Sequence, residues 1–314
     1  MDEIYIKIDG GIGRVLSATG VIEIFAKQKA SEGIKVNIVS SFPQLFYGLE
    51  GINRIYNIEM PYLYEDYISK GEFIEPEPYN HYLYYKDNEH ISTVFNFILN
   101  GKKEFVQPKM ILTENEIEEA KQHINSIKQN TGKKVLLIQA WGSQGGIVIQ
   151  DANEMKVRVD ESYRSLGTGF YTKLISKLKD NYYLASVQAT ANMNGQNIPQ
   201  AVMKDTNVFQ HQDIRKIIAT IPYVDGVIAC DSFLHHASAS LGTPVPTIVL
   251  WGATNEKNLG YEEQTNILSH KKVLYEPNRV PHDRSLYVNA NVGCNEFKFE
   301  IIDEIKFKLL VEPL

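Results

Sequence analysis

An acidic residue and a hydroxyl stand where an apolar segment of this sequence gives way to a helical pattern. Gly226–Cys230 is continuously apolar, which predicts a buried strand, and Asp231 and Ser232 follow it directly. The next residues, Ser232–Leu241, predict a helix whose first N–H groups have no partner within the helix. Such N–H groups bind phosphate groups, so this turn is a candidate diphosphate site. Capping of the helix by Asp231 or Ser232 is the simpler alternative.

A second loop of this kind follows the next predicted strand, Val245–Leu250. Gly252 and Thr254 lie just beyond it and offer backbone N–H groups and a hydroxyl. Because neighbouring parallel strands end at the same edge of a sheet, we expect the two loops to lie side by side. Together they predict a cradle for phosphate groups.

A glycine-rich turn, Gly10-Gly11-Ile12-Gly13, follows the first predicted strand of the chain. It lacks the third glycine of a dinucleotide-binding fingerprint, because Leu16 occupies that place. The second predicted strand is followed by Ser40-Ser41, without the acidic residue that would hold a ribose. An NAD-dependent oxidoreductase is therefore disfavoured. The glycines can still bring backbone N–H groups close to a ligand, or form an ordinary tight turn.

Two α/β units, each beginning with a strand, would position these turns. The expected elements of the first unit are the strands Glu3–Ile8, Lys35–Val39 and Ile52–Ile58 and the helices Arg14–Ala30 and Glu114–Gln129. The expected elements of the second are the strands Lys134–Gln139, Tyr182–Val187, Gly226–Cys230 and Val245–Leu250 and the helices Gly169–Lys179, Asp213–Ile221 and Ser232–Leu241. Strands that alternate with helices form parallel sheets, so the sequence predicts an α/β fold with two Rossmann-like domains.

The domain boundary is expected at Asn130–Lys133. Residues 1–130 then form the N-terminal domain and residues 131–296 the second domain. Residues 297–314 hold an amphipathic helix, Phe297–Leu310, which can pack back on the N-terminal domain. In the second domain, a loop of about thirty residues is expected after the first strand, and a loop of that length usually serves a function or is mobile.

The segment Glu59–His90 interrupts the regular pattern of the first unit. It contains seven tyrosines and eight acidic residues but only two lysines. We expect an insertion rich in loops, with short helical pieces, followed by a short helix or strand at Ile91–Leu99. Tyrosines can stack on sugars or nucleobases, or they can form a hydrophobic lid or a dimer contact.

Composition limits the class of protein further. The chain has 314 residues, a formal net charge of -6 and a pI of about 5.8, which disfavours non-specific binding to nucleic acid. No apolar run is long enough to span a bilayer, and Met1–Tyr5 does not begin a signal peptide. Two cysteines, Cys230 and Cys294, form neither a disulfide framework nor a zinc cluster alone. We therefore expect a cytoplasmic protein without stable membrane insertion.

The motifs together resemble the heptosyltransferase family of bacterial lipopolysaccharide synthesis, which has the GT-B fold. The family pattern of Asp-Ser/Thr, a histidine, Leu-Gly-x-Pro and an aromatic-Gly-x-Thr turn is matched by the following residues. They are Asp231-Ser232-Phe233-Leu234-His235-His236, Leu241-Gly242-Thr243-Pro244 and Trp251-Gly252-Ala253-Thr254. The resemblance implies two facing domains with a deep cleft between them, and a metal-independent inverting glycosyltransferase that uses a nucleotide-diphosphate sugar and no cofactor.

The resemblance also implies donor-binding residues. They are Ser143, Arg164, Asp231, Ser232, His236, Gly252 and Thr254. Arg164 stands where the family has a phosphate-binding lysine, and a guanidinium can hold a diphosphate through two hydrogen bonds. A surface position for Arg164 and simple packing for His236 are the alternatives. Phe233 replaces the glycine of the motif, which puts heptose itself in doubt as the sugar.

The catalytic base is the main departure from the family. The family's N-terminal glycine turn carries an aspartate that activates the acceptor, and Arg14 occupies its place. Because arginine cannot act as a base, we expect Asp9 to do so, with Gly11, Gly13 and Arg14 on the acceptor side. Alternatively, Arg14 binds an acceptor phosphate and another carboxylate is the base.

The sequence leaves two classes of acceptor possible, a saccharide and a DNA base. The abundance of Lys, Asn, Ile and Tyr is typical of AT-rich bacteriophage genes. A bacteriophage enzyme that glycosylates a hydroxymethylated base, such as hydroxymethylcytosine, is therefore one alternative. A nucleotide-sugar epimerase and a catalytically inactive nucleotide-sugar-binding module are the others. The oligomeric state is not indicated by the sequence.

Overall fold

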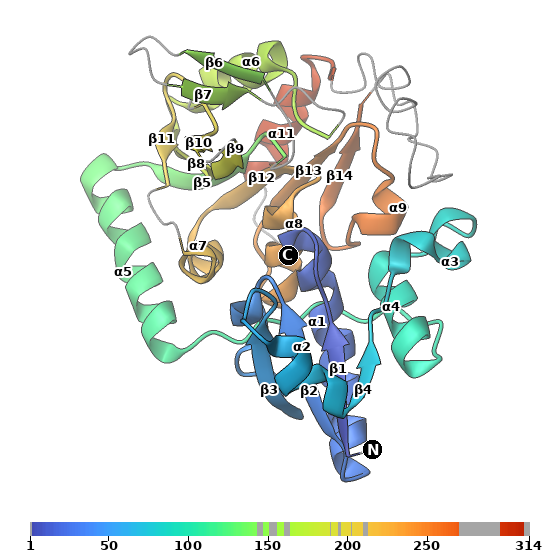
Figure 1. Ribbon diagram of the computed structural model, residues 1–314. Helices are drawn as coiled ribbons and strands as arrows, with labels where there is room; N and C mark the ends of the chain where they lie inside the picture. The colour runs from blue at the N-terminus through green and yellow to red at the C-terminus, as the bar shows by residue number, and fades with distance from the viewer. Residues whose placement is uncertain are drawn as a thin grey trace.

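The computed structural model describes residues 2–142, 147–150, 156–159, 164–188, 190–193, 196–201, 203–209, 213–269 and 296–310. The chain forms two α/β units, each built on its own parallel sheet, as Figure 1 shows. Among the residues described, no helix is both long and apolar enough to cross a membrane.

The first sheet has four parallel strands in the order β3-β2-β1-β4. They are β1 (Glu3–Lys7), β2 (Lys35–Ser40), β3 (Ile52–Asn57) and β4 (Glu72–Ile74). Helix α1 (Ile12–Ser31) covers the sheet and begins two residues before the predicted Arg14. The turn before it needs glycine, because Gly10 has a φ of +103°.

The insertion between β3 and α4 is a chain of short pieces, as the sequence predicted. They are α2 (Leu63–Asp66), a 3-10 turn at Ile68–Lys70, β4, a second 3-10 turn at Pro78–Asn80 and α3 (Tyr82–Tyr85). Strand β4 was not predicted, because three residues are too few to show an alternating pattern. The segment predicted as a helix or strand is the helix α4 (Ile91–Asn100), which Gly101 ends with a left-handed φ.

Helix α5 (Glu114–Thr131) connects the two units. The predicted capping box is present, with Thr113 and Glu116 bonding each other's backbone N–H groups. The helix ends at Gly132, whose φ is +67°, so it continues into the segment Asn130–Lys133 that the sequence analysis treated as a linker.

The second sheet has six parallel strands in the order β11-β8-β5-β12-β13-β14. They are β5 (Lys134–Gln139), β8 (Tyr182–Ser186), β11 (Asn207–Val208), β12 (Gly226–Cys230), β13 (Thr247–Trp251) and β14 (Thr265–Leu268). Numbered from β5 along the chain, this is the 3-2-1-4-5-6 order of the Rossmann fold. The order reverses between β5 and β12, which defines the topological switch point of the sheet.

One antiparallel hairpin corrects the prediction of a long loop after β5, and a second hairpin follows β8. The first is β6 (Ile147–Gln150) with β7 (Lys156–Val159), and the second is β9 (Thr190–Met193) with β10 (Gln196–Pro199). The first lies inside the segment that was predicted to be a loop. Both are outside the two parallel sheets.

The helices of the second unit are α6 (Thr168–Leu178), α7 (Ile214–Thr220), α8 (Phe233–Ser240), α9 (Glu256–Leu259) and α11 (Ile301–Leu310). The sequence allowed the C-terminal helix to pack on the N-terminal domain, but α11 lies in the second domain. It packs against α6, and Ile302, Ile305 and Leu309 are buried in the same hydrophobic cluster as α6. Its apolar stripe is therefore part of the second domain.

The two domains are packed together through a shared apolar interior. Helices α1 and α8 are in contact, and one hydrophobic cluster contains Leu16 and Ile22 from α1 as well as Leu234 and Ala237 from α8. Gly13 in the first turn of α1 lies so close to His236 that an added Cβ would stand 2.4 Å from the ring carbon Cδ2. This contact brings the carboxyl-end turn of β1 next to the carboxyl-end turn of β12.

Candidate functional site

The switch point of the second sheet lies between the strand-end loops of β5 and β12. Ala140–Gly142 follow β5, and Asp231 follows β12. Ligands of such sheets bind at the carboxyl ends of the strands on either side of the switch point. Asp231 is 3% exposed, and its Oδ2 atom has no hydrogen bond from any residue that the structure describes.

Arg164 lies beside Asp231 at this edge of the sheet. Its Nη1 atom is 3.9 Å from Oδ2 of Asp231. The segment that carries Arg164 is fixed across the end of β5, since Leu166 donates its N–H to the carbonyl of Ala140 at 2.8 Å. The hydroxyl of Ser165 also accepts the N–H of Gly142 at 2.9 Å. The segment that follows Arg164 is therefore anchored at the end of β5, next to Asp231.

The pKa of the Asp231 carboxyl is lowered despite its burial, which favours the ionised form. Burial acts to raise its pKa, but the side chains of His235, Arg164 and Thr254 outweigh it and lower the pKa. An ionised, buried carboxylate accepts hydrogen bonds and repels phosphate. The carboxyl ends of β5 and β12 therefore offer an acceptor for hydroxyl groups at Asp231 and a cation for phosphate groups at Arg164.

The N-terminus of α8 is capped in a way that was not predicted. Ser232 is the N-cap residue, but neither it nor Asp231 caps the helix through its side chain. The Ser232 hydroxyl donates to the carbonyl of Cys230 at 3.1 Å, and Oε1 of Gln139 accepts the N–H of Leu234 at 3.2 Å. Because Gln139 supplies this cap from β5, the side chain of Asp231 is left to other partners.

The loop after β13 lies beside this turn, because β12 and β13 are neighbours in the sheet. Gly252 and Thr254 are both buried, and the Thr254 hydroxyl has no hydrogen bond within the described part of the chain. The helix that follows, α9, has four residues, and Asn255 caps it by accepting the N–H of Lys257. The short helix α9 therefore offers no phosphate site at its N-terminus, and the loop itself would supply any contacts to a ligand.

His236 faces the domain interface. Its Nδ1 atom is 2.8 Å from the Tyr261 hydroxyl and 3.3 Å from the Ser17 hydroxyl, and its ring meets Gly13. Burial, with His235 and His90 nearby, holds the pKa of His236 well below its usual range. We therefore assign His236 to packing between the domains. The remaining predicted donor residue, Ser143, lies outside the described residues.

The first sheet has a similar switch point between β1 and β4. Asp9 and the glycine turn follow β1, and Glu75–Glu77 follow β4. The Asp9 carboxylate accepts the hydroxyl of Ser41 at 2.6 Å. Partial burial acts to raise the pKa of Asp9, but hydrogen bonds from Ser41 and the Gly10 N–H, with the charges of Lys7 and Arg14, lower it. Asp9 is thus a half-buried ionised carboxylate at this edge.

Arg14 is engaged by the insertion. Its Nη1 atom is 3.0 Å from Oε2 of Glu77, its Nη2 donates to the carbonyl of Pro76 at 3.1 Å, and its guanidinium lies 5.3 Å from the ring centre of Tyr79. Glu77 was not predicted as a site residue from the sequence. The run Glu75-Pro76-Glu77-Pro78 was the available signal, but without β4 it could not be placed beside the glycine turn.

A metal ion is a further chemistry that the described residues could support. Asp231, His235 and His236 each offer a ligand atom, and these atoms lie within 4.8 Å of one another. The guanidinium of Arg164 is also 3.9 Å from Asp231. A divalent cation beside it would be repelled, so the arrangement favours hydrogen bonding over metal binding.

The two strand-end edges therefore meet at the Gly13–His236 contact, with Asp9 and Arg14 on one side and Arg164 and Asp231 on the other. Two Rossmann-like domains arranged in this way define the GT-B class of folds. Comparison with protein-family models found no match, and comparison with curated protein sequences found none.

Solved structures of glycosyltransferases share this fold. The ADP-heptose lipopolysaccharide heptosyltransferase II of E. coli has a TM-score of 0.62 and 10% identity, over 99% of this chain and 99% of that chain. A family 9 glycosyltransferase of Veillonella parvula has a TM-score of 0.61 and 11% identity, over 98% and 97%. The dodecameric iron-containing heptosyltransferase TibC of enterotoxigenic E. coli, in complex with ADP-D-β-D-heptose, has a TM-score of 0.60 and 11% identity, over 98% and 76%. The predicted resemblance is confirmed at the level of the fold, and the depth of the cleft stays a prediction.

Proposed function

We propose that this chain is a glycosyltransferase that moves a sugar from a nucleotide-diphosphate sugar to an acceptor hydroxyl, with inversion at the anomeric carbon. The observation that carries the proposal is the pairing of Arg164 with Asp231 at the switch point of a Rossmann-ordered sheet. A diphosphate needs a cation and backbone N–H groups, and a sugar needs a hydrogen-bond acceptor. The shared fold with enzymes that bind ADP-heptose supports the same class of donor.

In the proposed mechanism, the donor lies on the second domain and the acceptor on the first. The ionised carboxylate of Asp9 takes the proton from the acceptor hydroxyl while its oxygen attacks the anomeric carbon. The bond from that carbon to the diphosphate breaks on the opposite face. Arg164 and the N–H groups of the turn after β12 stabilise the negative charge that develops on the departing diphosphate.

The acceptor side favours a molecule with an anionic group. Arg14 is held by Glu77 and Pro76, and Lys7 pairs with Glu75 at 2.7 Å. Both cations lie near the expected base, and both are balanced by carboxylates of the insertion. An acceptor phosphate or carboxylate could replace those carboxylates. We therefore propose a phosphorylated or acidic saccharide, with a modified DNA base as the alternative that an acceptor screen would reveal.

A donor screen tests the proposal directly. Nucleotide-diphosphate sugars with different bases and sugars are added to the protein, and its melting temperature is measured. A donor present at a hundred times its dissociation constant should raise the melting temperature by about 3 °C or more. The absence of any shift with a broad panel would contradict the donor assignment. If the protein interconverts the free donor sugar, it is an epimerase. If the donor stays intact in the presence of every acceptor tested, the protein is a nucleotide-sugar-binding module.

Replacing the proposed base tests the mechanism. Asp9→Asn keeps the size of the side chain and loses its ability to take a proton, so transfer should fall at least a hundredfold while donor affinity is kept. Transfer should also proceed in the presence of EDTA, because no step of the proposed mechanism uses a metal. Unchanged turnover of Asp9→Asn would remove Asp9 from the mechanism and direct attention to Glu77.

A further inference from the structure

A buried imidazole next to Asp231 has no hydrogen bond in the described structure. His235 is 0% exposed, and neither Nδ1 nor Nε2 has a partner there. Its Nε2 atom is 3.7 Å from Oδ1 of Asp231, which precedes it by one helical turn. A buried ring nitrogen without a partner is costly, so the nearest acceptor matters.

The packing around His235 fixes the direction of the ring. The ring lies 3.9 Å from that of His236 and 5.3 Å edge-on from that of Trp251, measured between centres. These aromatic neighbours leave little room for the ring to turn. A contraction of less than 1 Å between Nε2 and Oδ1 would give an ordinary hydrogen bond.

The two oxygens of Asp231 therefore face different groups. Oδ1 faces the ring of His235, and Oδ2 faces Arg164 and has no hydrogen bond among the described residues. We propose that His235 is a positioning residue, whose Nε2–H holds Oδ1 of Asp231 so that Oδ2 is presented to a hydroxyl of the donor sugar. This inference rests on the proposed function. It adds His235 to the residues on which donor binding depends, although His235 does not itself touch the donor.

The charge of Asp231 gives the inference a measurable consequence. The charged and titratable groups facing Asp231 are His235 on α8 and Arg164 before α6, with the hydroxyl of Thr254 after β13 and the ring of His236 beyond His235. Burial acts to raise the pKa of Asp231, and His235 is first among the groups that lower it. Without His235, the pKa of the carboxyl should rise, so the ionised form that accepts hydrogen bonds should be lost at a higher pH than in the natural protein.

Two variants and the donor found in the screen test this role. His235→Leu removes the N–H, and His235→Gln keeps an N–H close to the place of Nε2. His235→Leu should weaken donor binding at least tenfold at pH 7.5 and further as the pH falls to 5.5, measured by calorimetry. His235→Gln should bind within about threefold of the natural protein, with no pH dependence over that range. Circular dichroism and the melting temperature establish that both variants fold.

Other outcomes would overturn the inference. Natural affinity in His235→Leu at every pH would exclude a role for the ring, and equal, pH-independent losses in both variants would reduce His235 to packing. The purified natural protein could also contain about one transition metal ion per chain that both variants lack. That result would make the His235 ring a metal ligand instead.

A second measurement does not need the donor, so it separates this inference from the proposed function. Protein labelled with ¹⁵N-histidine, with the His235 signal assigned by its loss in His235→Gln, should show a proton on Nε2. An unprotonated Nε2 would contradict the hydrogen bond to Asp231 whether or not any nucleotide sugar binds.

Discussion

Arg14 stands where the resemblance implies a carboxylate, and its contacts show what replaces that group. The guanidinium is bonded to Glu77 and Pro76 of the insertion, while Asp9 receives the Ser41 hydroxyl at the other side of the glycine turn. In the proposed mechanism, the acidic function lies at the end of β1 instead of on the helix, and the helix carries the cation of Arg14. This arrangement agrees with the proposal of a negatively charged acceptor.

Arg164 gives the first prediction at this scale. Arg164→Ala should weaken donor binding by about ten- to a hundredfold, since charge-assisted hydrogen bonds to a diphosphate are worth about 1.5–3 kcal/mol. Arg164→Lys should recover part of that loss, because it keeps the charge and loses the two-pronged geometry. Lys177→Ala, on the exposed side of α6, is the control and should leave affinity unchanged. Donor affinity is measured by calorimetry. If Arg164→Ala and the control bind the donor equally well, the diphosphate does not bind at Arg164.

Gly13 gives the second prediction at the residue scale. An added methyl group would stand 2.4 Å from Cδ2 of the buried His236 ring, so Gly13→Ala should force the domains apart and destabilise the protein by about 1–2 kcal/mol. Gly11→Ala is the matched control, because nothing lies within 4 Å of its added methyl group. The melting temperature should fall clearly for Gly13→Ala and by much less for Gly11→Ala. A stable Gly13→Ala would mean that the two domains are not in close contact at this point.

The strand-end residues could be placed from the sequence because each lies within three residues of the end of a strand. Asp9, Asp231 and Thr254 all lie where that rule placed them. Glu77 could not be found, because β4 has three residues and only pairing with β1 reveals it. The contacts of His236 could not be predicted either, because the sequence does not show that α1 approaches α8 closely enough to touch its ring.

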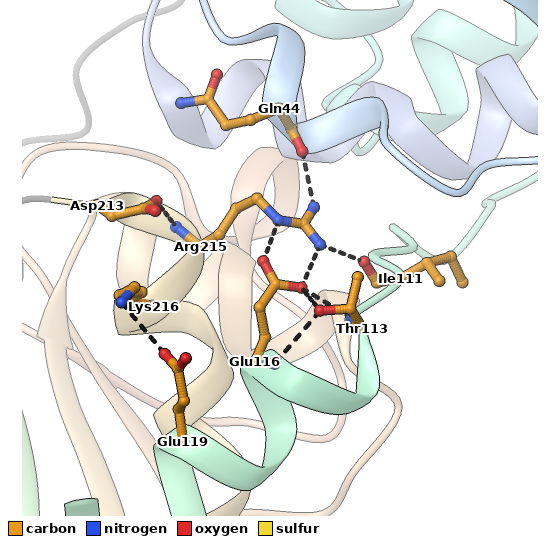
Figure 2. A network of polar contacts seen from close by, with 8 residues as sticks. All are labelled: Gln44, Ile111, Thr113, Glu116, Glu119, Asp213, Arg215 and Lys216. Carbon is orange, nitrogen blue, oxygen red and sulfur yellow. Dashed lines mark hydrogen bonds and ion pairs between the residues drawn. The ribbon is translucent and has the colours of Figure 1, made fainter.

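At the scale of elements, the first turn of α5 is tied to both domains. Arg215 on α7 is 6% exposed and donates to both carboxylate oxygens of Glu116 on α5. It also donates to the carbonyls of Gln44 and Ile111, each at 2.7 Å, as Figure 2 shows. Gln44 belongs to the 3-10 turn Pro43–Phe46 of the first domain. One guanidinium therefore joins the first domain, the connecting segment and the second domain.

This network predicts a pH dependence of stability. Hydrogen bonds from Arg215 lower the pKa of Glu116 to about 2, although partial burial acts to raise it. A lowered pKa stabilises the folded state above the ordinary value of 4.5, and the stabilisation is lost as the pH falls from there towards 2. Glu116→Gln should therefore destabilise the protein by about 2 kcal/mol at pH 7, with a difference from the natural protein that shrinks below pH 4.5.

A neighbouring ion pair provides the control. Glu119 and Lys216 join the same two helices at 3.2 Å, but their side chains are 66% and 46% exposed. Glu119→Gln should change the melting temperature little at any pH, because solvent screens an exposed pair. Equal effects of the two substitutions at pH 7 would show that burial of Arg215 adds nothing to the network.

At the scale of the whole molecule, the two domains share one apolar interior. The hydrophobic cluster that contains α1 and the first sheet continues through α8 into the second sheet, where it includes Val135, Val227 and Val249. Asn258, 1% exposed, also donates to the carbonyls of Tyr84 and Glu89, which fastens the insertion to the second domain. Separating the domains would expose this surface and leave these polar groups unpaired.

The chain should therefore unfold as one unit, and its tryptophans make this measurable. The sequence has two, Trp141 and Trp251, and both are buried in the second domain. Tryptophan fluorescence thus follows that domain alone, whereas far-ultraviolet circular dichroism follows the helices of both. In urea the two signals should change together with one midpoint, because neither domain keeps its interior without the other. A fluorescence transition displaced from the dichroism transition would show that the domains unfold separately, and that the contact of α1 with α8 does not join them into one cooperative structure.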